Sequence, residues 1–263
     1  MTPTDTEPMA PALCGRVALV TGAGRGLGAA TAEILAGAGA ELILMSRTGS
    51  ELEATVSRIR AHGGRATPVV CDVCDSAAVR GAFDRIPRLD ILVNSAGTNI
   101  PAAFVDVREE DLDRMLSLTV RAGFVVAQAS VKKMLETPLE KRMTGGSAVV
   151  HVTSQMGRVG SPRRSVYCMV KHAVEGLNKA MAVELASLGI RSNAVAPTFL
   201  ETSMTAPFFA GDPAFHEWVL NRIPLHRLGK VEEVARTILF LASPAASLIT
   251  GESVAVDGGW TAQ

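Results

Sequence analysis

The sequence predicts an α/β fold in which a doubly wound parallel sheet lies between two layers of helices. Strand-type and helix-type segments alternate along the 263 residues, and no repeat or linker-like stretch interrupts them. The strand-type segments are continuously apolar, which is typical of strands that helices cover on both faces. Apolar residues make up 48 % of the chain and aromatic residues only 4 %, which suits close packing of helices on a sheet. We therefore expect a three-layer, Rossmann-type domain whose ligands bind beyond the carboxyl ends of the strands.

The elements follow from the apolar runs in order. The first run predicts a strand at 16–20, which leads through a glycine-rich stretch into a helix at 29–38. A strand at 41–45 and a helix at 50–62 form the next unit. Further short apolar runs predict strands at 67–71, 91–93, 148–152, 192–196 and 253–256. The longer segments between them predict helices at 76–85, 109–135, 166–187 and 232–241.

The first dozen residues contain prolines and acidic residues but neither a basic nor an apolar region. We expect a disordered tail at 1–12, not a signal peptide, and a single dinucleotide-binding catalytic domain at 13–263. No apolar run reaches the roughly 18 residues that a membrane span needs, so the expected compartment is the cytoplasm.

Charge and cysteine content exclude several classes of protein. The net charge is zero, from 26 basic and 26 acidic residues, which argues against a nucleic-acid-binding protein or a polybasic membrane anchor. Cys71 and Cys74 have C-x-x-C spacing, but no second pair or nearby histidine completes a metal site. We expect no metal, and we expect one or both thiols to pack in the core.

A glycine-rich loop between the first strand and the first helix predicts a nucleotide site. Its glycines permit a tight turn and a close approach of the backbone, and the helix N-terminus offers free N–H groups to a pyrophosphate. The residues that we expect to bind there are Gly22, Gly24, Arg25, Gly26, Leu27 and Gly28.

The end of the second strand predicts which dinucleotide binds. A carboxylate there would bind the ribose 2′-hydroxyl, but this chain has Ser46 and Arg47, with Arg25 nearby in the loop. Two guanidinium groups and a hydroxyl suit a 2′-phosphate, so we expect NADP(H) rather than NAD(H). The alternative is that both arginines are solvated surface residues.

Tyr167, the one tyrosine of the chain, precedes Lys171 by four residues, so a helix places both on one face. Ser154 lies upstream at the end of a predicted strand. An ammonium beside a phenol lowers the phenol pKa, which would let Tyr167 exchange a proton with a substrate oxygen. The alternative is a buried tyrosine with a surface lysine that contacts nothing.

These residues together resemble the short-chain dehydrogenase/reductase family over nearly the whole chain. Residues 21–28 match its TGxxxGxG loop, residues 94–97 match its NNAG turn with Ser95 in place of an asparagine, and Tyr167 with Lys171 matches its YxxxK motif. The resemblance implies that the cofactor contacts Asp72, Val73, Asn94, Ala96, Gly97, Tyr167, Lys171, Pro197, Phe199 and Thr202.

The resemblance also implies the catalytic roles. Ser154 would hold the substrate oxygen, Tyr167 would be the acid in reduction and the base in oxidation, and Lys171 would bind the nicotinamide ribose. The fourth catalytic residue of the family is an asparagine that holds a water for proton relay to the lysine, and Thr119 stands at its position. A threonine hydroxyl still donates and accepts hydrogen bonds, so we expect activity to continue. Thr198 replaces a glycine near the nicotinamide and is a milder departure.

Residues 199–227 are expected to form an apolar substrate lid. Proline residues break this segment into short pieces, which favours mobility; the alternative is a helix pair whose aromatic residues only pack on the core. The segment includes the side chains of Phe199, Met204, Phe208, Phe209, Phe215, His216, Trp218 and His226.

We therefore expect an oxidoreductase that transfers a hydride between NADP(H) and a carbonyl or secondary alcohol. Two substrate classes stay open, a 3-oxoacyl thioester and a sugar acid or polyol. Arg158, Arg163 and Arg164 could meet an anionic or polyhydroxy substrate, or could equally be exposed loop charges. The alternative function, motivated by Thr119, is a cofactor-binding sensor or scaffold with weak or no turnover. The resemblance also implies a homotetramer formed through the long-helix pair and the C-terminal strand region.

Overall fold

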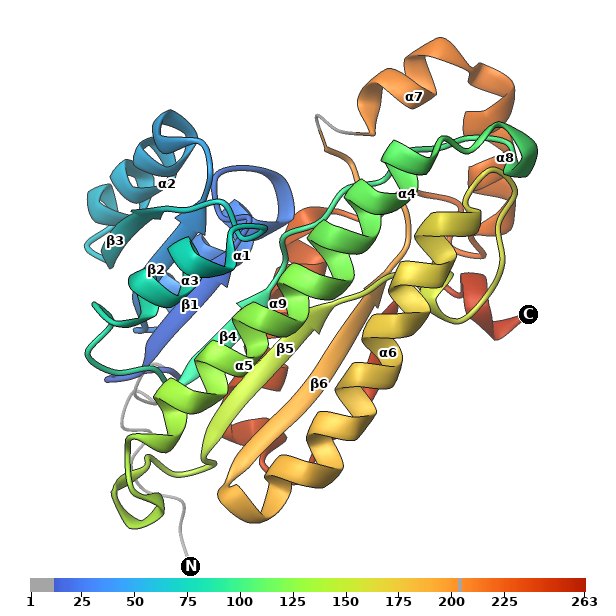
Figure 1. The fold of residues 1–263 in the computed structure, drawn as a ribbon. Coiled ribbons are helices and arrows are strands. Elements are labelled where there is room, and N and C mark those ends of the chain that lie inside the picture. The colour runs from blue at the N-terminus through green and yellow to red at the C-terminus, as the bar shows by residue number, and fades with distance from the viewer. Residues whose placement is uncertain (1–11, 203–204) are drawn as a thin grey trace, which may run out of the picture.

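One parallel sheet organises the computed structural model, which describes residues 12–202 and 205–263 (Figure 1). Among these residues, seven strands pair in the order β3-β2-β1-β4-β5-β6-β7. They are β1 Val17–Thr21, β2 Glu41–Ser46, β3 Arg65–Val70, β4 Ile91–Asn94, β5 Ser147–Val152, β6 Ile190–Pro197 and β7 Ser253–Val256. The central strands are buried on both faces, as their continuously apolar sequences require. The predicted doubly wound parallel sheet is confirmed.

Helices cover both faces of the sheet and complete the three layers (Figure 1). On one face lie α1 Gly26–Gly37, α2 Gly49–Ala61 and α9 Val231–Ala242, which share an apolar core with the strand side chains of that face. On the other face lie α3 Ser76–Phe83, α4 Glu109–Met115, α5 Ala122–Leu135 and α6 Ser165–Leu185. Two short helices, α7 Ala206–Gly211 and α8 Pro213–Arg222, lie beyond the end of β6. No helix in the described part of the chain is long and apolar enough to cross a membrane.

The predicted elements are confirmed, with ends that shift by up to three residues, apart from the helix predicted at 109–135. That helix is one rod interrupted by a π-helical segment, Leu116–Arg121, between α4 and α5. A π turn differs from an α turn in its i→i+5 hydrogen bonds, which the residue pattern does not reveal, so the sequence reads as a continuous helix. Residues 1–11 of the predicted tail and Met204 of the predicted lid lie outside the described residues.

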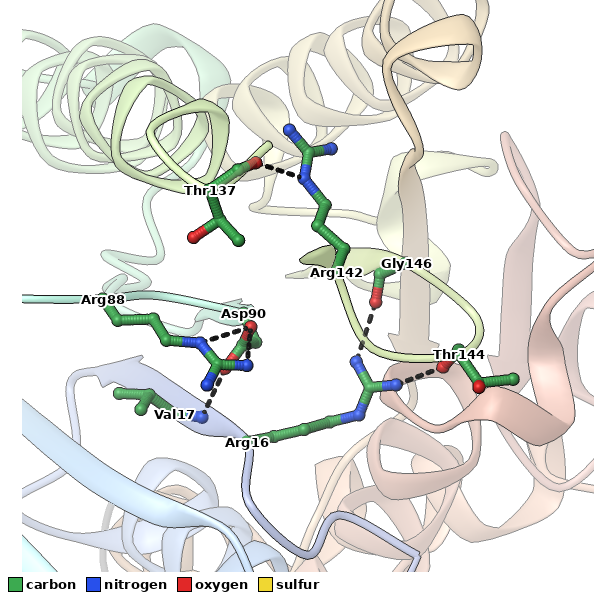
Figure 2. A network of polar contacts seen from close by, with 8 residues as sticks. All are labelled: Arg16, Val17, Arg88, Asp90, Thr137, Arg142, Thr144 and Gly146. Atoms are coloured by element: carbon green, nitrogen blue, oxygen red, sulfur yellow. Dashed lines mark hydrogen bonds and ion pairs between the residues drawn. The ribbon is translucent and has the colours of Figure 1, made fainter. Parts of the chain in front are cut away.

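A polar network fixes the amino ends of the strands, opposite the end where ligands are expected (Figure 2). The buried Arg16 guanidinium donates to the carbonyl of Gly146 at 2.7 Å and to that of Thr144. The buried Asp90 carboxylate accepts from the Val17 backbone N–H at 2.8 Å and pairs with Arg88 at 2.9 Å. Because every buried charge here has partners, this end of the sheet is held rigidly.

Candidate active site

A cavity of about 510 Å³ lies at the carboxyl ends of the strands and collects most of the predicted site residues. Its walls include residues that follow β1, β2, β4, β5 and β6, together with the start of α6. The predicted residues that line it are Gly22, Gly24, Arg25, Gly26, Leu27, Gly28, Ser46, Arg47, Asp72, Val73, Ala96, Gly97, Ser154, Tyr167, Lys171, Pro197, Phe199 and Thr202.

The glycine loop needs its glycines for backbone conformation and for space. Gly22 has a φ of +67°, and a Cβ there would lie 3.2 Å from the Ala96 Cα. A Cβ on Gly28 would collide with the Gly22 carbonyl. Arg25 is the N-cap residue of α1, and its side chain makes no capping hydrogen bond. The N–H groups in the first turn of α1 therefore face the loop without a side-chain acceptor from the N-cap. Such a cradle fits the pyrophosphate of a dinucleotide.

The two arginines expected at the adenosine end differ in their surroundings. Arg25 lies 3.5 Å from the carboxylate of Glu51, which also lines the cavity and was missed at the level of the sequence. Arg47 is exposed at the cavity wall and forms no ion pair within the described part of the chain. Arg47 is therefore the cation best placed to meet a 2′-phosphate.

Ser154 follows β5 and turns the chain back toward the cavity. Its hydroxyl accepts from the Met156 backbone N–H at 3.2 Å and donates to the Pro197 carbonyl at 3.5 Å. The short turn Gln155–Gly157 that it caps packs against α6. This cap fixes the serine side chain between the ends of β5 and β6.

Tyr167 and Lys171 lie one turn apart near the start of α6, as their spacing predicts. The Lys171 Nζ lies 5.6 Å from the centre of the Tyr167 ring and donates to the Val152 carbonyl at 2.8 Å. Burial lowers the pKa of Lys171 to about 8, and the carboxylate of Glu175 acts in the opposite direction. The lysine is thus anchored to the end of β5, close to the tyrosine.

The pKa of Tyr167 shifts in the direction opposite to the expected lowering. Burial raises this pKa, while the Ser154 hydroxyl and the Arg164 guanidinium act in the opposite direction. The phenolate loses its hydration in the cavity wall, and this cost outweighs the neighbouring donors and cations. The protein therefore holds Tyr167 as a neutral phenol.

Asn94 and Thr119 are the predicted site residues that do not line the cavity. The Asn94 amide donates to the Gly123 carbonyl at 2.9 Å and accepts from the Thr21 hydroxyl at 3.2 Å, so it joins β4 to α5 and β1. Thr119 is buried in the π-helical segment, and its hydroxyl has no hydrogen-bond partner among the described residues. Leu118 lines the cavity in its place.

The predicted lid forms an aromatic cluster with the C-terminus. Phe199, which lines the cavity, packs at ring-centre distances of 5.9 Å against Phe209, Phe215 and Trp260. Trp218 packs at 5.8 Å against Phe215 and Trp260. The aromatic side chains that the structure describes in this segment thus pack together as one cluster, and Phe199 links that cluster to the cavity.

Two polar cavity residues stand out beyond those expected for catalysis. Gln155 directly follows Ser154 and was missed, although its position beside a predicted catalytic serine was a usable signal. Arg164 also lines the cavity, whereas Arg158 and Arg163 are exposed. The structure thereby separates three arginines that the sequence could not distinguish.

Comparison with known proteins identifies the family. The family model described as enoyl-(acyl carrier protein) reductase matches residues 22–261. A 3-oxoacyl-(acyl-carrier-protein) reductase from Thermotoga maritima is 37 % identical over 249 residues, which cover 93 % of this chain and 97 % of the relative. The chain belongs to the short-chain dehydrogenase/reductase family. L-Xylulose reductase from Bos taurus is 39 % identical to this short-chain dehydrogenase/reductase over 250 residues, covering 95 % of the chain and 98 % of the relative.

A solved structure agrees with the sequence comparison. Gluconate 5-dehydrogenase from Burkholderia cenocepacia, in complex with NADP and tartrate, superposes with a TM-score of 0.89 at 33 % identity. The match covers 97 % of this chain and 98 % of that chain. The predicted family is confirmed, and this short-chain dehydrogenase/reductase is an oxidoreductase.

Proposed function

We propose that this protein transfers a hydride between NADP(H) and the carbonyl or secondary alcohol of a small substrate. The observation that supports the proposal is that Ser154, Tyr167 and Lys171 line the same cavity as the glycine loop. Two substrate classes fit the relatives, a 3-oxoacyl thioester and a sugar acid or polyol. The substrate oxygen would lie against the serine and tyrosine hydroxyls.

Each of the three side chains has a role that its surroundings support. The Ser154 hydroxyl, held by the Met156 N–H, would donate to the substrate oxygen. Burial keeps Tyr167 protonated, so its phenol would give its proton to that oxygen during reduction. Lys171, anchored on the Val152 carbonyl, would orient the nicotinamide ribose and favour the phenolate that remains.

The cofactor would supply the hydride, and the chain would hold it by its phosphates. The cradle of Gly22, Gly24, Gly26 and Gly28 fits the pyrophosphate, and Arg47 with Ser46 suits the 2′-phosphate of NADP(H). The related gluconate 5-dehydrogenase was solved with NADP, which agrees with this choice.

The proposal extends to the organisation of the protein. Residues 13–263 would act as one catalytic domain, with residues 199–227 as a lid that closes over the substrate. The aromatic contacts of Phe199 support coupling between the lid and the cavity. We also propose that the protein is a cytoplasmic homotetramer.

Oxidation of NADPH by the purified protein, measured with a panel of ketones, oxo acids and oxoacyl thioesters, tests the proposed activity. Tyr167→Phe should lower kcat by about 10²- to 10⁴-fold, because the proton donor is lost, and should leave NADPH binding unchanged. Activity that survives this substitution would contradict the mechanism. NADPH binding with no turnover of any panel member would favour the alternative, a cofactor-binding sensor or scaffold that owes its inactivity to Thr119.

A further inference from the structure

One of the three arginines between Ser154 and Tyr167 is built into the active-site cavity. Arg164 is only 6 % exposed, yet it lines the cavity, and it is the N-cap residue of α6. The preceding Arg163 has a φ of +60°, a left-handed conformation that is rare for a side chain of this size. This backbone turn leaves Arg163 exposed while the next residue is buried in the wall. The chain thus adopts an unfavourable conformation next to a buried cation.

The Arg164 guanidinium lacks the partners that the other buried arginines have. Arg191 is 7 % exposed and donates to the carbonyls of Leu241 at 2.8 Å and Ser243 at 3.1 Å. The Arg164 side chain makes one hydrogen bond within the described residues, from Nη1 to the carbonyl of its own neighbour Arg163 at 3.1 Å. Its Nε has no partner there, and it forms no ion pair with a described carboxylate.

A second polar side chain in the same wall is equally unsatisfied. Gln155 is 1 % exposed, and neither its amide oxygen nor its amide nitrogen has a hydrogen-bond partner among the described residues. It directly follows Ser154 and lines the cavity together with Arg164. The Asn99 amide oxygen and the Thr198 hydroxyl, which also line the cavity, have no partner among the described residues either. Buried polar groups are normally paired, so these unpaired ones on one cavity indicate a polar ligand.

The two side chains together specify the chemistry of that ligand. A guanidinium binds a carboxylate or a phosphate through two parallel hydrogen bonds. Of the two substrate classes that stay open, the sugar acids carry such a carboxylate next to their hydroxyl groups. The Gln155 amide adds one donor and one acceptor, which suits a carboxylate oxygen or a neighbouring hydroxyl. Arg164 lies directly before α6 and three residues before Tyr167, and both side chains line the cavity. The bound carboxylate would therefore lie close to the reacting carbonyl.

We infer that Arg164 and Gln155 bind the carboxylate of the substrate, which makes the substrate a small oxo acid or hydroxy acid of the sugar-acid type. This inference rests on the proposed function and chooses between its two substrate classes, because a neutral polyol or an oxoacyl group offers the buried guanidinium no negative charge. A related gluconate 5-dehydrogenase, solved with tartrate, shows that the family includes proteins that bind such acids.

Two matched substrate pairs test whether the protein prefers a substrate with a carboxylate. 5-Keto-D-gluconate and L-sorbose differ only by a carboxylate in place of a hydroxymethyl group, and acetoacetate differs from methyl acetoacetate by its free carboxylate. The wild type with NADPH should favour at least one acid over its neutral partner by about 10- to 100-fold in kcat/KM, the range expected for a charged hydrogen bond. Equal or better turnover of both neutral partners would overturn the inference.

Substitutions of the arginines assign the preference to a residue. Arg164→Met should bring the ratio of kcat/KM for the acid to that for its neutral partner close to one, and Arg164→Lys should restore part of this ratio. Arg163→Met, which alters the exposed neighbour, is the matched control and should keep the preference. Because the guanidinium is buried without an acidic partner, Arg164→Met should also leave Tm unchanged or raise it. A lower Tm with equal losses on acid and neutral substrates would assign Arg164 a structural role and overturn the inference.

Binding measurements separate this inference from the proposed function. If no panel substrate is turned over, the proposed function fails, and titration calorimetry of the NADPH complex with D-gluconate and D-glucitol still decides the role of Arg164. Binding of D-gluconate that is lost in Arg164→Met, without a change in NADPH affinity, supports the carboxylate site. Equal affinity for the two compounds, or binding of neither, overturns it.

Discussion

His151 is a buried titratable residue that the proposed mechanism does not use. It lies on β5 with no exposed surface, and neither ring nitrogen has a hydrogen-bond partner among the described residues. Burial lowers its pKa from 6.5 to about 4, and the charge of Lys171 acts in the same direction. The folded protein therefore keeps this imidazole neutral at pH values where the unfolded chain protonates it.

This difference predicts a loss of stability in acid. Between about pH 6.5 and pH 4 the unfolded state binds the extra proton, so the free energy of unfolding should fall as the pH falls through this window. Over the whole window, this pKa difference lowers the free energy of unfolding by about 3 kcal/mol. Urea unfolding of the wild type and of His151→Gln at several pH values measures it. The variant should lose most of the slope, and an unchanged slope would exclude His151 as its source.

Arg47 is predicted to decide the preference for NADP(H). Because Arg25 lies beside the Glu51 carboxylate, Arg47 is the cation that a 2′-phosphate would meet without competition. Arg47→Asp should lower kcat/KM for NADPH by about 10- to 100-fold and raise it for NADH, since a carboxylate repels the phosphate and binds the free hydroxyl. Arg25→Ala should have a smaller effect. A wild type with comparable kcat/KM for the two cofactors, or a preference for NADH, would contradict the prediction.

At the scale of elements, the π-helical segment Leu116–Arg121 decides what Thr119 can do. It places the Thr119 hydroxyl in a buried position off the cavity wall, without a partner in the described part of the chain. Thr119→Asn should raise kcat or leave it unchanged, because an amide reaches farther than a threonine hydroxyl. Thr119→Val, which keeps the shape and removes the hydroxyl, is the matched control. A tenfold or greater drop in kcat for Thr119→Asn would show that the threonine is adapted to a task of its own.

The sequence predicted those elements whose signal is local. The strands follow from continuous apolar runs, and the glycine loop follows from a steric requirement, since Gly22 has a positive φ and Gly28 has no room for a Cβ. The π turn could not be predicted, because it changes which backbone groups are hydrogen-bonded without a distinctive residue pattern.

The cavity residues that the sequence missed depend on tertiary contacts. Arg158, Arg163 and Arg164 are chemically identical, and only the packed structure shows that the last is buried. The tyrosine pKa was expected to fall because a neighbouring lysine was visible in the sequence. The desolvation that raises it depends on residues distant in the chain.

At the scale of the whole molecule, the two ends of the sheet differ in how fully their buried polar groups are paired. At the amino ends, Arg16 and Asp90 have their partners within the protein (Figure 2). At the carboxyl ends, Arg164 and Gln155 keep unpaired polar atoms in the cavity wall. A ligand site must be held in place and must also keep polar groups free to bind. The paired amino ends hold the sheet in place, and the unpaired groups at the carboxyl ends can bind a ligand.

The outer surface of α5 and α6 has exposed apolar side chains that indicate an interface between subunits. Phe124 on α5 is 48 % exposed and Val183 on α6 is 85 % exposed, and the two helices lie side by side on one face of the sheet (Figure 1). Exposed apolar side chains on adjacent helices are typical of an interface between subunits, and closed symmetric assemblies are the common outcome. The family resemblance implies a homotetramer, and these exposed side chains support an interface on α5 and α6. We therefore predict about four times the chain mass of 27.6 kDa.

Light scattering of the wild type and of two surface variants tests this assembly. Val183→Glu places a charge in the predicted interface and should shift the mass toward dimer or monomer, because a desolvated carboxylate without a partner opposes association. Val70→Glu, at an exposed position at the end of β3, is the matched control and should keep the wild-type mass. A monomeric wild type would refute the assembly. A tetramer that persists in Val183→Glu would contradict an interface at this position of α6 and would favour another exposed apolar residue, such as Leu248, which is 97 % exposed.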